Sequence, residues 1–247
     1  MRPARLTVVL VAHGSRDPRG AAATEALARA VRRLRPDWDV RASYLDHAGP
    51  RPLDVLAALP GRRAVVVPLL LTKAYHGRID IPAVLSAAAE LPVSVTLAEV
   101  LGPVAAFPAP EVPALVLDGL VRRLPSAGLD AVVLAAAGTR DPAARATVEW
   151  AADALSARLS LPCAVAYSSA APPLPAAAVD LLRASGARRI GVAAYFLAPG
   201  RLYDLAAGSA REAGAVAVAE PLSDAPELAR LVAARVTESL PGVTAAA

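Results

Sequence analysis

The chain contains three histidines, and each lies soon after a short run of apolar and β-branched residues. His13 follows the first run, Asp46 and His47 follow the second, and His76 follows the third. An imidazole pair with a carboxylate can bind a first-row divalent cation such as iron, cobalt, nickel or zinc. The same groups can transfer protons near neutral pH. The sequence therefore indicates a metal or acid–base site assembled from separate loops.

The first histidine lies in a segment that the chain repeats. Residues 8–18 read VVLVAHGSRDP, and residues 132–142 read VVLAAAGTRDP. His13 aligns with Ala137, while the glycine, arginine, aspartate and proline are kept. A repeat that keeps its turn and loses its one ionisable ligand does not need the imidazole for folding. We therefore expect two similar halves, residues 1–125 and 126–247, with the chemistry in the first.

Both halves alternate short β-branched runs with longer alanine-, leucine- and arginine-rich stretches, which predicts βαβ units around a parallel sheet. The predicted fold class is α/β, with two similar βαβ halves of about four strands each, flanked by helices. Predicted strands cover residues 6–12, 40–45, 64–71, 93–98, 131–135, 163–167, 190–196 and 215–219. Predicted helices cover residues 18–34, 51–58, 112–124, 142–159, 176–185, 201–213 and 226–240, and another begins near residues 81–82. The helix at residues 112–124 is expected to close the first half.

The carboxyl ends of parallel strands meet at one edge of a sheet, where ligands usually bind. His13, the pair at residues 46–47 and the segment at residues 73–78 all follow strands of the first half. The predicted topology therefore brings histidines and a carboxylate to one edge. Pro18 suits the first position of the helix that follows His13.

Composition narrows the class of protein. Of the 247 residues, 55% are hydrophobic and 19% are charged, which is typical of a globular chain. The net charge of +4, without a basic tract, argues against a nucleic-acid partner and slightly favours small acidic molecules. Cys163 is the single cysteine, so the chain can build neither an internal disulfide nor a multi-thiolate metal site. The first apolar run is too short for a signal segment, and no stretch approaches about 18 apolar residues, so we expect a cytoplasmic protein with no membrane partner.

Two other enzyme classes fit the sequence less well. Histidine phosphatases carry an arginine before the nucleophilic histidine, and this chain has Ala12 there, so that class is disfavoured. Ser15 and Arg16 nevertheless precede a helix and could hold an anion at its N-terminus. The chain has neither the GxxxxGK[ST] nor the GxGxxG motif, so no nucleotide cofactor is expected.

Three segments of the first half together resemble the sirohydrochlorin chelatases, the class II chelatases that insert a divalent metal into sirohydrochlorin. They read VAHGSRDP, YLDHAGPRPLDVL and VVVPLLLTKAYHGRIDIPAVL. The second half resembles the family more faintly, and the chain resembles the fused, two-half form. Leu202 falls near the place of His76, and Ser169 near that of Asp46, so the second half would be degenerate and form the other wall of the cleft.

The resemblance implies roles for individual residues. The family's metal-binding histidines fall on His13 and His76. Asp46 stands where the family often has a glutamate, and either Asp46 or a histidine would take the pyrrole protons. The cations Arg16, Lys73 and Arg78, with Ser15, would bind the carboxylates of the substrate, and Tyr75 would line the macrocycle or simply pack. His47 would be a third ligand or a surface residue, and the surface interpretation is favoured because neighbours after a strand often point apart.

The function that the resemblance implies is ATP-independent insertion of Fe²⁺ or Co²⁺, with Ni²⁺ as a further candidate, for sirohaem or cobalamin biosynthesis. The metal is a substrate, and the partner is a small tetrapyrrole. A non-catalytic metal or tetrapyrrole carrier is the alternative, because a carrier also needs histidine ligands. We expect a monomer, with a homodimer as the alternative.

Overall fold

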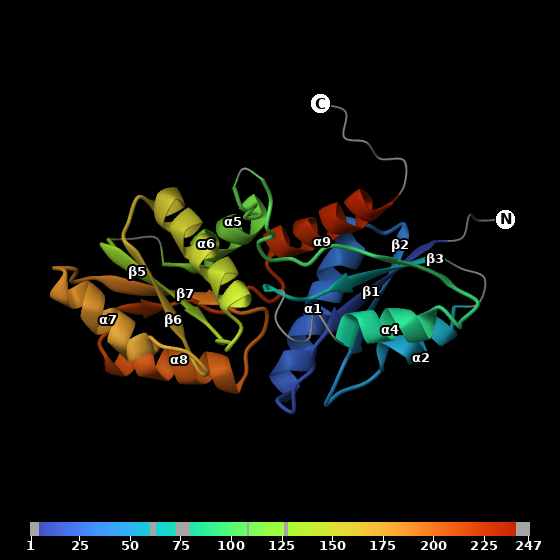
Figure 1. The fold of residues 1–247 in the computed structure, drawn as a ribbon, viewed down its shortest axis with the longest axis horizontal. Helices are drawn as coiled ribbons and strands as arrows, with labels where there is room; N and C mark the ends of the chain where they lie inside the picture. The colour runs from blue at the N-terminus through green and yellow to red at the C-terminus, as the bar shows by residue number, and fades with distance from the viewer. Residues whose placement is uncertain (1–4, 60–62, 73–79, 108, 126–127, 241–247) are drawn as a thin grey trace. The chain divides into compact units, whose positions relative to one another are not determined.

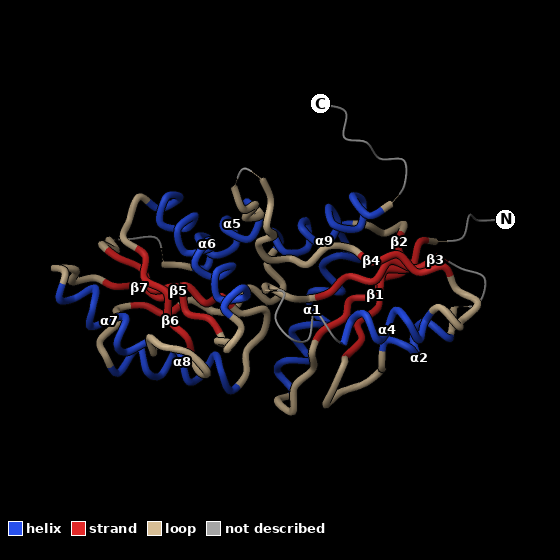
Figure 2. Tube along the Cα trace, viewed as in Figure 1, coloured by secondary structure: helices blue, strands red, loops and turns tan. Residues whose placement is uncertain are grey.

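The computed structural model describes residues 5–59, 63–72, 80–107, 109–125 and 128–240. It contains two four-stranded parallel sheets, with strand orders β2-β1-β3-β4 and β6-β5-β7-β8 (Figures 1 and 2). The two sheets have the same spatial order of strands, with β5, β6, β7 and β8 in the places of β1, β2, β3 and β4. This confirms the predicted α/β fold with two similar halves.

The first sheet contains β1 (Leu6–Ala12), β2 (Trp38–Tyr44), β3 (Arg63–Pro68) and β4 (Ser94–Leu97). Its helices are α1 (Pro18–Leu34), α2 (Pro52–Ala57), α4 (Asp80–Ala88) and α9 (Pro226–Ser239). Val9 and Val11 of β1 pack into a buried cluster with residues of α2 and α4. The alternate residues Val8 and Leu10 are also fully buried, as expected of a central strand covered on both faces.

The second sheet contains β5 (Ala131–Ala136), β6 (Cys163–Tyr167), β7 (Ile190–Tyr195) and β8 (Ala217–Val218). Its helices are α5 (Ala114–Arg123), α6 (Pro142–Leu159), α7 (Pro175–Ala184) and α8 (Arg201–Glu212). Alanines of α7 and α8 pack against Val133 and Ala135 in one buried cluster. Small side chains let these helices lie close to the sheet, which explains the high alanine content.

The strand predictions were correct in number and order, with shifts at the ends. The third strand stops at Pro68 instead of residue 71, because the N–H of Leu70 turns back to the carbonyl oxygen of Pro68 at 2.9 Å. The eighth strand is reduced to Ala217–Val218. Hydrophobic periodicity does not show where a chain turns away from its neighbour, so such ends are the least predictable part of a fold.

The last helix of each sequence half packs on the other half's sheet. The chain forms two compact units, residues 1–101 with 224–247, and residues 102–223. The helix expected to close the first half, α5, instead contacts α6 and β7 of the second unit. The last helix of the chain, α9, contacts α1 and β3 of the first unit. The predicted helix over residues 112–124 is therefore confirmed, but it packs on the second unit instead of closing the first half.

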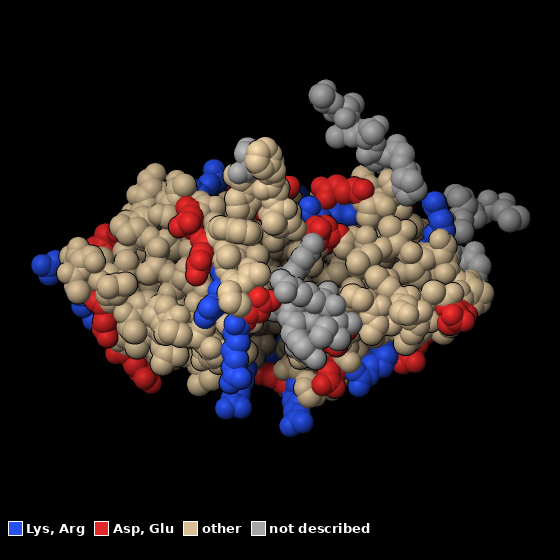
Figure 3. All heavy atoms as spheres, viewed as in Figure 1, with Lys and Arg blue, Asp and Glu red and all other residues tan. Residues whose placement is uncertain are grey.

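The C-terminal helix is well anchored in the first unit. Leu228, Leu231, Val232 and Val236 are buried, and the buried Arg235 donates from Nε to the carbonyl oxygen of Val100 at 3.1 Å. Arg235 also pairs with Glu238 at 3.0 Å. Among the described residues, no helix is both long and apolar enough to cross a membrane. Basic and acidic side chains form small separate groups on the face drawn in Figure 3.

Candidate functional site

His13 and Asp46 lie next to each other at the carboxyl edge of the first sheet. The ladder between β1 and β2 pairs Ala12 with Tyr44 at its end. It continues beyond both strands, because the N–H of Leu45 donates to Ala12 at 2.9 Å and the N–H of Asp46 donates to His13 at 2.8 Å. The adjacency that the topology predicted is therefore set by backbone hydrogen bonds.

A glycine makes this close approach feasible. Gly14 has φ +95°, and a Cβ atom at this position would lie 1.8 Å from the carbonyl oxygen of Asp46. Only glycine can take this conformation and leave this space. Gly14 thus allows the turn after His13 to contact the turn that carries Asp46.

His47 is exposed, as the surface interpretation predicts, and its ring nevertheless lies beside that of His13. Its ring stands edge-on to the ring of His13, with centroids 6.3 Å apart and an interplanar angle of 85°. Its Nε2 lies 3.4 Å from Oδ2 of Asp46. Residue 47 has φ +60°, a left-handed conformation that reverses the chain after Asp46. That reversal is what brings the ring back, and it is not visible in a hydropathy pattern.

Asp46 carries the negative charge of the site. Its Oδ1 accepts the backbone N–H of His47 at 2.8 Å, and Nη2 of Arg51 lies 3.7 Å away. The hydrogen bond from His47 is the main reason that the pKa of the Asp46 carboxyl lies below its usual value, and the charges of His47, Arg51 and His13 lower it further. The group is therefore a carboxylate at neutral pH, able to bind a cation or accept a proton.

Four predicted site residues, Lys73, Tyr75, His76 and Arg78, lie outside the described residues. Within the described ranges, no group of three or more His, Cys, Asp or Glu side chains is arranged to hold a metal ion. Of the described residues, the structure brings His47 next to both His13 and Asp46, but not in the arrangement of a metal site. The proposed partnership of His13 with His76 stays a prediction.

Ser15 and Arg16 occupy the turn between β1 and α1. The Oγ of Ser15 accepts the N–H of Asp17 at 3.0 Å, and Asp17 caps α1 by accepting the N–H of Arg19 at 2.9 Å. Thr139 and Asp141 make the same two contacts before α6. Ser15, like Thr139 in the second copy, thus has a structural role in its turn. Arg16 is exposed.

The turn after β6 repeats the backbone of the Asp46 turn with different side chains. The N–H of Ser169 donates to Ala137 at 3.1 Å, as that of Asp46 does to His13. Ala170 has φ +64°, matching the +60° of His47. Gly138 has φ +94°, and its Cβ would lie 1.9 Å from the carbonyl oxygen of Ser169. The predicted correspondence between Ser169 and Asp46 therefore holds at the level of backbone geometry.

Residue-by-residue comparison of the two turns also identifies a residue that the sequence reasoning missed. In order, residues 44–52 read YLDHAGPRP and residues 167–175 read YSSAAPPLP. Besides the acid, His47 is replaced by Ala170 and Arg51 by Leu174. Leu202, expected near the place of His76, is the exposed second residue of α8. Aligning the two turns in the sequence would have singled out Arg51.

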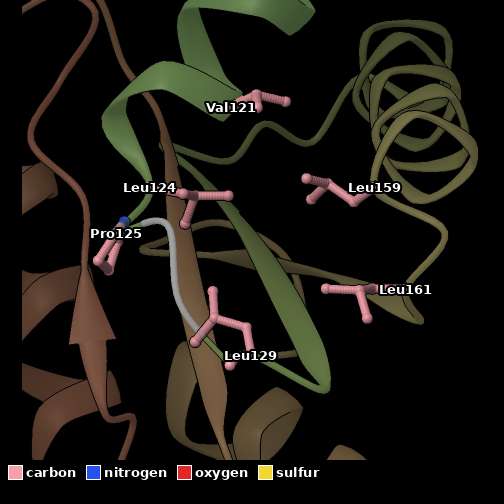
Figure 4. Close-up of a pocket in the computed structure, with 7 residues that line it drawn as sticks. Val121, Leu124, Pro125, Leu129, Leu159 and Leu161 are labelled. Atoms are coloured by element: carbon pink, nitrogen blue, oxygen red, sulfur yellow. The ribbon is translucent and has the colours of Figure 1, made fainter.

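A cavity in the second unit lies away from this chemistry. It has a volume of about 270 Å³ and is lined by Val121, Leu124, Pro125, Gly128, Leu129, Leu159 and Leu161 (Figure 4). Several of these residues precede β5 and β6, so the cavity lies at the amino edge of the second sheet. Its lining has no titratable side chain, so it cannot supply acid–base or metal chemistry.

Comparison with known proteins agrees with this fold. The CbiX family model matches residues 7–109 and 131–239. The chain therefore belongs to the CbiX family, with both of its halves matched. Among curated proteins, none matches the chain.

Solved structures share the fold at low sequence identity. SirB from Bacillus subtilis with Fe³⁺ has a TM-score of 0.75 and 19% identity, with 96% of each chain covered. The sirohydrochlorin chelatase SirB from Bacillus subtilis subspecies spizizenii in complex with cobalt has a TM-score of 0.74 and 19% identity, covering 96% of this chain and 95% of that one. CbiX, described as the terminal enzyme for biosynthesis of siroheme in denitrifying bacteria, has a TM-score of 0.65 and 21% identity, covering 96% and 100%.

Proposed function

We propose that this protein is a sirohydrochlorin chelatase that inserts Fe²⁺ or Co²⁺ into sirohydrochlorin without a nucleotide. Ni²⁺ is a third candidate metal. Membership of the CbiX family supports this function, as do the names of the similar structures. The observation that carries the proposal is the backbone hydrogen bond that places His13 and Asp46 side by side at the carboxyl edge of the first sheet.

The reaction requires that one metal ion replace two protons. Two pyrrole N–H bonds break, the metal forms bonds to the macrocycle nitrogens, and two protons leave. His13, with His76, would hold the incoming metal through neutral nitrogen donors, which bind first-row divalent ions without the strength of a thiolate. Asp46, ionised at neutral pH, would accept a proton from the macrocycle.

Recognition of the macrocycle would depend on cations, because sirohydrochlorin carries carboxylates on its rim. Arg16 is exposed in the turn after His13, so it can reach a ligand at this edge. Lys73 and Arg78 are expected to contribute similarly, and Tyr75 is expected to lie against the macrocycle. Charge-assisted pairs of arginine with carboxylate are strong and directional. The Ser15 hydroxyl is a weaker candidate, since it already bonds the backbone of Asp17.

The test is anaerobic conversion of sirohydrochlorin with Fe²⁺, Co²⁺ and Ni²⁺, followed by absorbance. A nitrogen-and-carboxylate site discriminates weakly among these ions, so both iron and cobalt should be inserted faster than without protein. A carrier would bind metal or tetrapyrrole and leave the insertion rate at its uncatalysed value. That result would overturn the chelatase assignment. The choice between the sirohaem and cobalamin pathways would follow from the metal supplied in the cell.

We also infer that the protein acts as a cytoplasmic monomer. Both halves of the CbiX pattern are present in one chain, so a second copy is not needed to supply the missing half. Light scattering during size-exclusion chromatography should give a mass near 25.2 kDa. A stable mass of twice this value would favour the homodimer.

A further inference from the structure

We propose that His47 and Arg51 are positioning residues that hold the Asp46 carboxylate in a fixed orientation beside His13. The inference rests on the proposed function, because it assigns how the acid of that site is held. We call His47 and Arg51 together the carboxylate clamp. A turn of the same backbone geometry forms in the second half without either side chain, and both residues contact Asp46.

His47 contacts both Asp46 and His13. Its backbone N–H donates to Oδ1 of Asp46 at 2.8 Å, and its Nε2 lies 3.4 Å from Oδ2. The same imidazole stands edge-on against the ring of His13. One residue therefore touches both carboxylate oxygens and the neighbouring imidazole. Moving or removing the ring would change the position of the acid relative to His13.

Arg51 approaches the carboxylate from the start of α2. It occupies the N-cap position, and its guanidinium donates from Nη1 to the carbonyl oxygen of Leu45. Nη2 then lies 3.7 Å from Oδ1 of Asp46. Bonding to the residue before Asp46 holds the guanidinium in place. An exposed ion pair contributes little to stability, so the pairing of Arg51 with Asp46 adds little to folding.

The second half of the chain is a natural control for the clamp. The turn after β6 keeps the backbone hydrogen bonds and the left-handed residue, with Ala170 and Leu174 in place of His47 and Arg51. The acid is replaced as well, by Ser169, whose hydroxyl bonds the carbonyl oxygen of Ala137 at 3.0 Å. The same fold thus forms without the clamp, and both clamp residues are absent where the acid is absent. Their presence beside Asp46 therefore serves the acid.

The second turn also defines the test variant. His47→Ala combined with Arg51→Leu converts the clamp into the residues of the second turn, which fold there. Arg41→Leu is the matched control, because Arg41 forms a half-buried ion pair with Asp39 at 2.8 Å on β2 of the same unit. Circular dichroism and thermal melting establish that the variants are folded. Arg51→Lys, which keeps the charge but not the planar fork, serves if the double variant does not fold.

We expect the double variant to lower kcat/KM for cobalt insertion by about tenfold, the lower end for residues that orient a metal-site ligand. The KM for sirohydrochlorin should stay unchanged, since the clamp acts through Asp46. Arg41→Leu should behave as wild type, and Arg51→Lys should lose part of the activity. An unchanged kcat/KM in the double variant would overturn the proposal. A raised KM for sirohydrochlorin would overturn it too, because it would mean that Arg51 binds the substrate directly.

Titration with Co²⁺ alone separates this inference from the proposed function. If wild-type protein binds Co²⁺ and inserts no metal, the chelatase assignment fails, and the clamp is still tested by affinity because the Asp46 carboxylate beside His13 attracts a cation held there. Removing the positive charge of Arg51 would by itself strengthen cation binding. A roughly tenfold weaker affinity in the double variant would therefore identify loss of positioning. Equal or tighter Co²⁺ binding would contradict the clamp.

Discussion

Gly14 lies so close to Asp46 that a Cβ atom on residue 14 would stand 1.8 Å from the Asp46 carbonyl oxygen. Gly14→Ala should therefore destabilise the protein and lower insertion activity together. A left-handed non-glycine residue costs about 1–3 kcal/mol, and the clash adds to that value. Urea denaturation and insertion assays measure the two effects.

Gly186→Ala is the control for the backbone conformation alone. Gly186 has φ +101°, but a Cβ atom there meets nothing within 4 Å. Its alanine variant should lose less stability than Gly14→Ala and keep its insertion activity. If the two variants were equally stable, the close contact with Asp46 would not be a real constraint.

His13→Ala and His76→Ala should each lose most of the chelatase activity while the fold survives. The second copy has Ala137 where the first has His13, and its turn keeps the same hydrogen bonds. Substitutions at Ala137 or Ser169 should change activity much less. Insertion rates and circular dichroism provide the comparison, and near-normal rates in folded histidine variants would remove these residues from the site.

Insertion should slow as the pH falls through roughly 7 to 5.5, because an ordinary imidazole titrates near 6.5 and a protonated ring offers no lone pair to a metal. Asp46 should not cause this decline. Its pKa is depressed, so its carboxylate is present above that low value and is lost only in more acidic solution. A rate profile that is flat between about pH 5 and 8 would be incompatible with imidazole ligands.

Leu228→Ala should destabilise the first unit, although Leu228 lies in the second half of the sequence. The side chain is buried in α9, which packs on α1 and β3, and truncating a buried leucine costs about 2–5 kcal/mol. Hydrogen exchange should show reduced protection in β1 and β3. Leu181→Ala, at an exposed leucine of α7, is the control and should stay within about 0.5 kcal/mol of wild type. Loss of protection mainly in β5 and β7 would contradict the placement of α9.

Cys163 should resist alkylation in the folded protein. Burial raises the pKa of its thiol to about 12, so the reactive thiolate is scarce at neutral pH. Iodoacetamide at about pH 8 should modify the unfolded chain, because an ordinary cysteine thiol titrates near 8.5. It should leave the native protein and its activity intact. Rapid labelling of native protein with loss of insertion would place Cys163 in the chemistry.

The sequence alone determined the fold class and predicted that His13 and Asp46 lie together. Periodicity predicted two parallel sheets, since buried central strands are continuous apolar runs that end in recognisable turns. The repeat predicts that the chemistry lies in the first half, because His13 and Ala137 occupy equivalent turns. The position of the acid also followed, because adjacent parallel strands end at one edge and place Asp46 beside His13.

Only the tertiary structure decided which way His47 points, what Arg51 contacts and where the last helices pack. The left-handed conformation of residue 47 turns its ring toward His13, and that dihedral angle leaves no trace in the hydrophobic pattern. Arg51 reaches Asp46 because α2 begins beside the end of β2. The helices α5 and α9 each have an apolar face that would suit either sheet, so their amphipathic sequences do not specify a partner. Long-range packing determines the sheet on which each helix lies, and α9 packs on the unit that carries the candidate site.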